Sequence, residues 1–228
     1  MQTHYITPKR IQTFQEKIIT WFDENGRKFP WRKSKLTHYQ LVIAEVLLQR
    51  TKAETIQKFY PVFIKRYPNW KSLHRTKKNT LEKVLQPIGL FRQRAALLKK
   101  LAREMNIRNG HLPNKREEIE KLPFAGQYIV NAIMLLIKKK PAPLLDVNMA
   151  RVLERYFGPR KLSDIRYDPY LQELAWKVVQ HEETVKINWG ILDFAALICR
   201  ASKPNCNYCF LNTKCRHNIQ TKIMKPTF

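Results

Sequence analysis

Four cysteines near the carboxyl end are the densest group of reactive side chains in this sequence. Cys199, Cys206, Cys209 and Cys215 are the only cysteines among 228 residues, and they are spaced Cys-x6-Cys-x2-Cys-x5-Cys. Four thiolates this close together can bind a tetrahedral zinc ion, ligate an iron-sulfur cluster or pair as disulfides. We expect all four to hold one metal centre.

The composition argues against disulfides. A chain of 27.2 kDa can bury a core without cross-links, and the segment from Met1 to Arg10 lacks the apolar core of a signal peptide. The sequence therefore indicates a reducing compartment. Zinc ribbons usually show two Cys-x2-Cys knuckles, whereas this chain has one knuckle with unequal arms, so the spacing favours iron-sulfur over zinc by a small margin.

Two carboxylates stand out by their surroundings. Glu45 has aliphatic residues at i−4, i−3 and i+3, which places its side chain on an apolar helix face. Burial there raises the pKa, and an acid protonated near neutral pH can donate a proton; the alternative is an ion pair with Arg32 or Arg50. Asp146 precedes a helix expected near Asn148, where it can cap the helix, and the helix N-terminus favours its ionised form.

The charge balance indicates a polyanionic partner. Lys and Arg number 43 against 18 Asp and Glu, which gives a formal net charge of +25. Such an excess favours nucleic acid, with a solvated basic surface or an anionic membrane as alternatives. No stretch reaches the roughly 18 apolar residues needed to span a bilayer, so we expect a soluble, cytoplasmic and nucleoid-associated protein.

Helices must position these groups, because the apolar periodicity is helical nearly everywhere and only 6 glycines are available for tight turns. The sequence therefore predicts an all-α protein. Prolines, including Pro61, are expected between the helices. The expected helices are Ile11 to Phe22, Leu41 to Leu48, Thr55 to Tyr67, Leu81 to Ile88, Arg92 to Met105, Ile129 to Lys138, Met149 to Phe157, Tyr170 to Gln180 and Trp189 to Cys199.

Residues 117–133 have a helix-hairpin-helix pattern. A short helix is followed by Leu122-Pro123-Phe124-Ala125-Gly126 and by a second apolar helix. A tight turn of this kind exposes backbone N–H groups at the start of the second helix, where they can bind a phosphate. An ordinary turn between two packed helices is the alternative.

Taken together, these motifs resemble the endonuclease III superfamily of DNA glycosylases over most of the chain. The resemblance rests on residues 29–32 (Phe-Pro-Trp-Arg), 45–51, 88–90 and 144–153, together with the hairpin and the cysteine window. Residues 29–32 and the Glu45 helix are similar to the MutY branch. Gln49-Arg50-Thr51 with Tyr128 is most similar to the short thymine-DNA mismatch glycosylases of archaeal type.

The resemblance implies two helical lobes with a DNA-binding cleft between them. Residues 34–139 would form a six-helix lobe that contains the hairpin. Residues 1–33 and 140–228 would form a second lobe with a 4Fe-4S cluster, which in this superfamily is structural or contacts DNA. MutY proteins carry a further domain that recognises 8-oxoguanine, and we expect none here because the chain stops 13 residues after Cys215.

The resemblance also implies roles for three catalytic side chains. Asp146 would stabilise positive charge on the sugar and orient water, unless it serves only as a cap. Glu45 would donate a proton or hydrogen bond to the departing base. Tyr128 replaces the lysine with which bifunctional members form an imine, and a phenol cannot do so. A monofunctional enzyme is therefore expected, with a core aromatic as the alternative for Tyr128.

Two loops and the hairpin are expected to contact DNA. The amide of Gln49 and the apolar side chain of Leu90 or Phe91 would fill the space left by an extruded base, although Leu90 and Phe91 could instead be core residues. Phe124 replaces the first glycine of the family hairpin, which alters the phosphate contact. The full expected set is Gln49, Arg50, Gly89, Leu90, Phe91, Phe124, Gly126 and Gln127.

The hypothesis is thus a monomeric glycosylase that removes thymine or uracil mispaired with guanine in double-stranded DNA. Removal of adenine from A·G or A·8-oxoguanine mispairs is one alternative. A non-catalytic iron-sulfur protein that binds mismatches is another.

Overall fold

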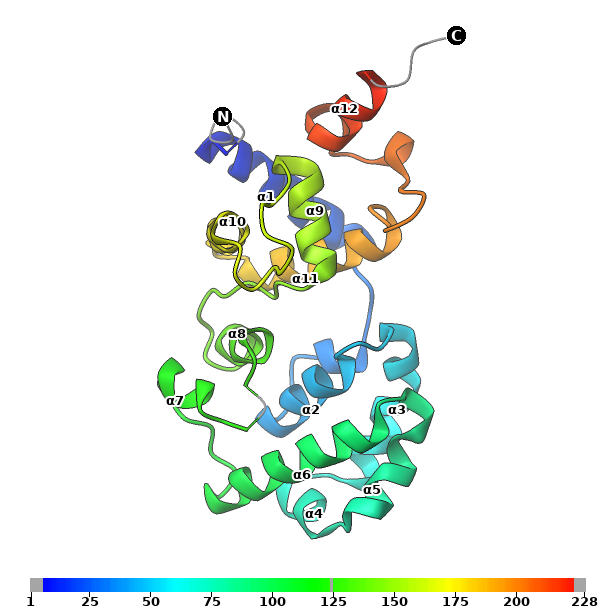
Figure 1. Cartoon of the computed structure of the whole chain (residues 1–228), viewed down its shortest axis with the longest axis vertical. Helices are drawn as coiled ribbons and strands as arrows, with labels where there is room; N and C mark the ends of the chain where they lie inside the picture. Colours follow the sequence, from blue (N-terminus) through cyan, green and yellow to red (C-terminus); the bar gives the residue numbers. More distant parts are fainter. Residues whose placement is uncertain (1–5, 124, 224–228) are drawn as a thin grey trace. The chain divides into compact units, whose positions relative to one another are not determined.

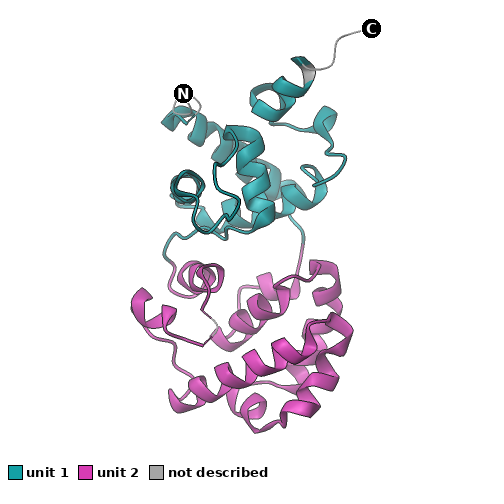
Figure 2. Ribbon diagram, in the orientation of Figure 1, with its two compact units in different colours: residues 1–27, 140–228 teal, residues 28–139 magenta. Residues whose placement is uncertain are grey.

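The computed structural model describes residues 6–123 and 125–223, which form helices joined by turns and loops, with no strand among them. The expected all-α class is confirmed. Figure 1 shows the helices along the chain, and Figure 2 shows its two compact units. Unit 1 consists of residues 1–27 and 140–228, and unit 2 consists of residues 28–139.

Unit 2 is continuous in sequence. It begins at residue 28, whereas the six-helix lobe was expected to begin at residue 34. The additional residues include the 3-10 helix η2 (Pro30–Arg32), which packs against helices α2 and α3 of unit 2. Its other elements are α2 (His38–Leu48), α3 (Ala53–Arg66), α4 (Trp70–Arg75), α5 (Lys78–Leu85), the 3-10 helix η3 (Gln86–Ile88), α6 (Phe91–Ile107), α7 (Arg116–Glu120) and α8 (Gln127–Leu136).

Helix α2 is the centre of unit 2. Its residues from Val42 to Leu47 are all buried, and it packs against both α3 and α8. Thr37 begins it with a capping box, in which the Thr37 side chain accepts a hydrogen bond from the backbone N–H of Gln40 and the Gln40 side chain accepts one from the Thr37 N–H. A helix buried on all sides has few places for a charged side chain, which makes any carboxylate within it unusual.

Unit 1 is assembled from the two ends of the chain. Its N-terminal part is α1 (Pro8–Asn25), and the rest consists of α9 (Val147–Phe157), α10 (Pro169–Val179), α11 (Thr184–Leu197), the 3-10 helices η4 (Cys206–Tyr208) and η5 (Asn212–Lys214), and α12 (Arg216–Ile223). Helix α1 packs against α10 and α11, and α9 packs against α10, α11 and α12.

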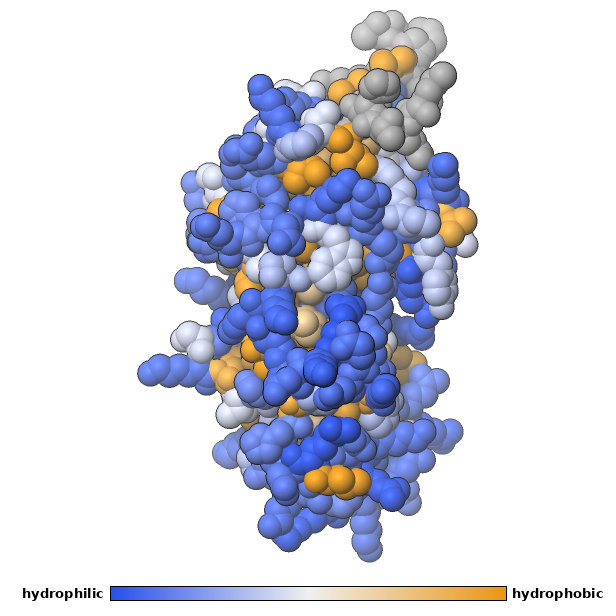
Figure 3. Space-filling model, turned by 90° about the vertical axis from the view of Figure 1, so that its left-hand side faces the viewer, coloured by the Kyte–Doolittle hydropathy of each residue, from blue (hydrophilic) through white to orange (hydrophobic). Residues whose placement is uncertain are grey.

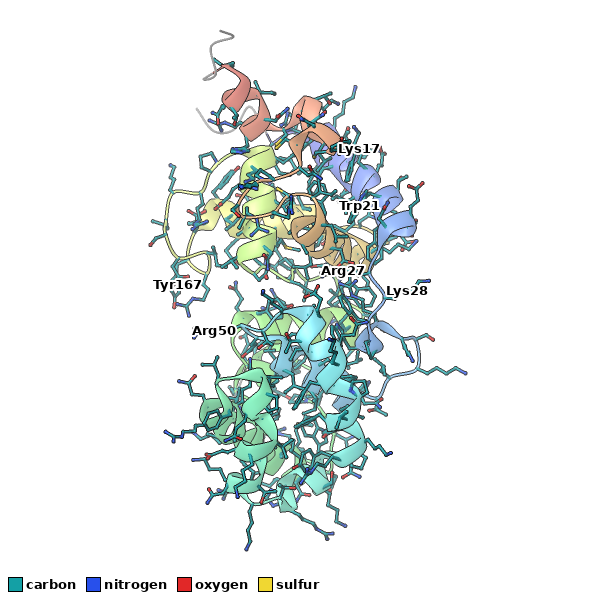
Figure 4. All side chains as sticks on the ribbon, turned by 90° about the vertical axis from the view of Figure 1, so that its right-hand side faces the viewer. Lys17, Trp21, Arg27, Lys28, Arg50 and Tyr167 are labelled. Carbon is teal, nitrogen blue, oxygen red and sulfur yellow. The ribbon has the colours of Figure 1, made fainter. Side chains whose placement is uncertain are left out.

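The contact between α1 and α11 depends on Gly190. A Cβ atom at this position would lie 2.7 Å from Cγ2 of Ile18, so only glycine allows this close approach. Where α1 ends, Arg27 donates its backbone N–H and its Nε–H to the fully buried carboxylate of Asp193, each at 2.8 Å. This ion pair fixes the point at which the chain leaves unit 1, and Figure 4 labels Arg27 there.

Candidate active site and metal centre

Glu45 is a buried acid in the middle of helix α2. Its side chain is only 6% exposed, as the aliphatic neighbours at i−4, i−3 and i+3 predict. Burial raises the pKa of Glu45 to about 7, although a hydrogen bond from the hydroxyl group of Tyr128 and the positive charge of Arg32 oppose this rise. Among the described residues, the second carboxyl oxygen, Oε2, has no hydrogen-bond partner. The structure therefore contains a buried carboxyl group whose raised pKa lets it exchange a proton near neutral pH.

Three segments of unit 2 bring this group together. Tyr128 is the second residue of α8, which packs against α2, and Arg32 ends the 3-10 helix η2, which also packs against α2. The guanidinium group of Arg32 lies over the ring of Phe29, 5.0 Å from its centroid. Of the two arginines considered as partners of Glu45, Arg32 is the one that affects its pKa, whereas Arg50 is exposed to solvent.

Asp146 lies in unit 1 and caps helix α9, as expected. Its Oδ1 accepts hydrogen bonds from the backbone N–H groups of Asn148 (2.9 Å) and Met149 (2.8 Å), and its Oδ2 accepts one from the amide Nδ2 of Asn148 (2.7 Å). These donors favour the ionised carboxylate, but burial opposes them more strongly, so the pKa of Asp146 is raised. The helix N-terminus was expected to favour the charged form, and in the structure desolvation outweighs this effect.

A chain of hydrogen bonds within unit 1 extends from this carboxylate to the cysteine segment. Asn148 donates to Asp146, Arg151 Nη1 donates to Oδ1 of Asn148 at 3.1 Å, and Arg151 Nε donates to the carbonyl of Cys199 at 2.9 Å. The orientation of Asp146 is therefore tied to the backbone that carries the first cysteine.

The two loops expected to contact DNA both belong to unit 2. Gln49 and Arg50 follow α2 and are exposed, and Figure 4 labels Arg50 at this loop. Leu90 precedes α6 and is 43% exposed, whereas Phe91 is half-buried and lies under the guanidinium group of Arg92. Arg50, Leu90 and Gly89 have left-handed backbone angles, with φ of 56°, 49° and 70°.

The expected hairpin connects α7 to α8. Gly126 is the N-cap residue of α8, with φ of −63°, and no side chain caps the helix at this end. Gly126 is exposed, and a Cβ atom added to it would have no neighbour within 4 Å among the described residues. Gln127 is the first residue of the helix, and Phe124 lies outside the described residues.

The four cysteines line one hollow in unit 1 that is partly open to solvent. Arg155 donates a hydrogen bond from Nη1 to the sulfur of Cys199 at 3.4 Å. Burial, together with repulsion from the other thiolates, raises the pKa of Cys209 to about 11, so a bound cation is needed to hold this sulfur as a thiolate. Within residues 6–123 and 125–223, no three His, Cys, Asp or Glu side chains are placed to hold a single metal ion. The four thiols nevertheless line the same hollow, and a thiol is a ligand type that both zinc ions and iron-sulfur clusters use.

Comparison with known protein families assigns residues 43–181 to HhH-GPD, the superfamily of base excision DNA repair proteins. The chain belongs to the HhH-GPD superfamily. The matched residues include Glu45, the hairpin, Tyr128 and Asp146, which are the features that suggested a DNA glycosylase from sequence.

Individual HhH-GPD relatives match almost the whole chain. A thymine/uracil-DNA glycosylase of Methanothermobacter thermautotrophicus is 36% identical over 92% of this chain and 96% of its own length. A thymine-DNA glycosylase of Aeropyrum pernix is 33% identical, with the same coverage. The solved structure of a thermostable thymine-DNA glycosylase superimposes with a TM-score of 0.85 at 35% identity, covering 93% of this chain and 98% of that one.

Sequence reasoning missed one buried arginine of this HhH-GPD protein. Arg94 is 5% exposed and donates hydrogen bonds to both exposed loops of unit 2. The signal was present, because its helical neighbours Phe91, Leu97 and Leu98 are apolar, and the same criterion had singled out Glu45.

One face of the molecule is mostly hydrophilic. Figure 3 shows one face covered mostly by hydrophilic side chains, with small separate hydrophobic patches. None of the described helices is long and apolar enough to cross a bilayer.

Proposed function

We propose that this chain is a monofunctional DNA glycosylase that removes thymine or uracil mispaired with guanine. The thymine/uracil-DNA glycosylase named above is similar over nearly its full length, which supports this substrate class. The observation that carries the proposal is the pair of Glu45 and Tyr128, in which a buried acid with its pKa raised to about 7 accepts a hydrogen bond from a phenol. The protein acts as a monomer on double-stranded DNA.

The first step is extrusion of the mispaired nucleotide. A base within a duplex cannot be reached by a side chain, and the cost of unstacking it is lower at a mismatch, which contributes to selectivity. Gln49 and Leu90 fill the space that the base leaves. The exposure of Leu90 supports it as the apolar side chain of this pair, whereas Phe91 is half-buried.

Glu45 and Asp146 then have different roles in breaking the glycosidic bond. Glu45 in its protonated form donates to the departing base. The ionised Asp146 stabilises positive charge that develops on the sugar and orients the attacking water. The C–N bond breaks, the base leaves with the proton of Glu45, water adds its hydroxyl to the sugar, and the proton that water loses restores the protonated form of Glu45.

Tyr128 limits the reaction to hydrolysis. A phenol does not condense with the aldehyde of an opened sugar, so no imine forms at this position and the DNA strand stays intact. Its hydrogen bond to Glu45 supports a second role, in which the hydroxyl group orients the acid and sets its pKa.

The backbone of the hairpin and the positive charge hold the DNA. The positive end of the α8 dipole, at the exposed N-cap residue Gly126, attracts a phosphate of the DNA backbone. Arg50 adds a cation at the exposed loop after α2. Since the net charge is +25, affinity for any duplex falls as the salt concentration rises.

Cys199, Cys206, Cys209 and Cys215 hold a 4Fe-4S cluster. Four thiolate ligands are the usual set for such a cluster, and the hollow that these residues line supports this assignment. When bound, the cluster cross-links the segment after α11, while bond cleavage is left to the acids.

A panel of duplexes tests the function. The purified protein is incubated with G·T, G·U, A·G and A·8-oxoguanine duplexes, and released base and strand cleavage are measured separately. We expect free thymine and uracil, with strands that break only after alkaline treatment. Release of adenine alone would favour the adenine glycosylase alternative, which has some support because an adenine DNA glycosylase of Buchnera aphidicola is 32% identical, with 60% of its length covered. Mismatch binding without release of any base would leave a non-catalytic protein.

A further inference from the structure

Arg94 joins two loops that are far apart in the sequence. From the first turn of α6, its Nη1 donates to the carbonyl oxygens of Ile88 (2.5 Å) and Gly89 (2.7 Å). Its Nη2 donates to Oγ1 of Thr51 (2.5 Å) and to the carbonyl oxygen of Gln49. A single buried guanidinium group thus holds the loop after α2 and the loop before α6, both within unit 2.

Both loops have backbone conformations that need such support. Arg50 and Leu90 have φ of 56° and 49°, a left-handed region that residues with a Cβ atom rarely occupy. Each follows a carbonyl group that accepts from Arg94, since Gln49 precedes Arg50 and Gly89 precedes Leu90. The hydrogen bonds to these two carbonyl oxygens hold the peptide planes directly before Arg50 and Leu90. They thereby stabilise the left-handed backbone conformation of both residues.

The chemistry of the clamp is specific to arginine. The guanidinium group is planar and offers several N–H donors in a fixed fork, so it can satisfy acceptors on two segments at once, whereas an ammonium group is a point charge on a flexible stem. All four acceptors are neutral oxygens. None of these four acceptors carries a negative charge, so the guanidinium charge beneath the two exposed loops favours an approaching polyanion.

The side chains that these loops present are exposed and differ in chemistry. Gln49 offers an amide at the end of α2, and Leu90 offers an aliphatic side chain that is 43% exposed at the start of α6. If Gln49 and Leu90 enter a base stack, holding both loops in one geometry before binding increases the affinity for DNA. The loops then lose less conformational entropy on binding.

We propose that Arg94 is a positioning residue that locks the Gln49 loop and the Leu90 loop into one rigid wedge, which replaces the extruded base in the duplex. This inference rests on the proposed function, since it concerns the extrusion step of that reaction. Arg94 acts through Gln49 and Leu90 and takes no part in bond cleavage.

The experiment compares Arg94→Lys, Arg94→Met and a control, Arg103→Met. Arg103 lies on the same helix and is exposed, so the control removes one charge from α6 without touching the loops. Each protein is measured for its affinity for a duplex with a tetrahydrofuran abasic analogue opposite guanine and for a fully paired duplex. The affinity ratio reports wedge insertion, because an abasic gap is already open to the wedge, and it does not depend on glycosylase activity.

We expect wild type and Arg103→Met to prefer the abasic duplex by the same ratio. Both Arg94 variants should lose about tenfold or more of this preference, and Arg94→Lys should not rescue it although it keeps the charge. Combining Arg94→Lys with Leu90→Ala should cost little more than either change alone, because both disable the same wedge.

The proposal would be overturned if folded Arg94→Lys kept the wild-type preference for the abasic duplex. It would also be overturned if the two changes in the double variant reduced this preference by the product of their separate effects. Loss of the helical circular dichroism signal in both Arg94 variants would show instead that the residue is purely structural. Failure of the proposed function would look different. Wild type would then release no thymine, while the dependence of the abasic preference on Arg94 would persist.

Discussion

Replacing Glu45 with glutamine should change stability in a way that depends on pH. The pKa of Glu45 is about 7 in the folded protein and 4.5 in the reference state. As the pH rises above 4.5, Glu45 ionises in the unfolded chain before it ionises in the folded protein. The free energy of unfolding of wild type therefore falls until pH about 7 and is constant above it. A difference of about 2.5 in pKa corresponds to a fall of about 3 kcal/mol in the free energy of unfolding. The Glu45→Gln variant should not show this fall, because an amide does not titrate.

Urea unfolding of both proteins, followed by circular dichroism from pH about 5 to about 9, measures this effect. Subtracting the two unfolding free energies removes the contributions of other titrating groups, because these are the same in both proteins. The variant should become more stable relative to wild type as pH rises, whereas its rate of base release should fall about 100-fold because it cannot deliver a proton. Parallel stability curves would show that Glu45 titrates normally, and the proposed acid would be lost.

Three further predictions concern the other groups. Asp146→Asn should lower the rate of base release by at least about 100-fold, and substantial remaining activity in a single-turnover assay would contradict the role of Asp146. The stability of this variant should stay within about 1 kcal/mol of wild type, because asparagine caps a helix equally well. Tyr128→Phe removes a hydrogen bond that stabilises ionised Glu45, so the alkaline limb of the kcat/KM profile should move to higher pH, and an unmoved limb would refute the coupling. Wild type should contain about four iron atoms per chain and Cys209→Ser far fewer by elemental analysis, whereas zinc in the wild-type protein would exclude the cluster.

The helices could be predicted from sequence because each buries a continuous apolar stripe. Helix α2, expected from Leu41, begins at His38 because Thr37 caps it. Helix α4, Trp70–Arg75, was missed because six residues are too few to show a period. Pro61 was expected between helices and lies inside α3, where its exposed position tolerates the lost hydrogen bond while Tyr60 and Phe63 anchor the helix in the core.

The candidate site could be predicted only in part. The burial of Glu45 and the capping position of Asp146 follow from residues within one helical turn, which a sequence displays directly. The hydrogen bond from Tyr128 to Glu45 and the bridge made by Arg94 join segments that are distant in the chain. Such contacts depend on how α8 and α6 pack against the rest of unit 2. The spacing of residues within a single helix does not predict this packing.

The discontinuity of unit 1 has a consequence for biosynthesis. Helix α1 leaves the ribosome early, but α11, which supplies Gly190 and Asp193 for its packing, is completed only at Leu197. At typical translation speeds this interval lasts on the order of ten seconds, during which unit 2, residues 28–139, can fold by itself. The apolar stripe with Phe14 and Ile18 stays uncovered meanwhile, so the nascent N-terminal helix is where a chaperone has most time to bind.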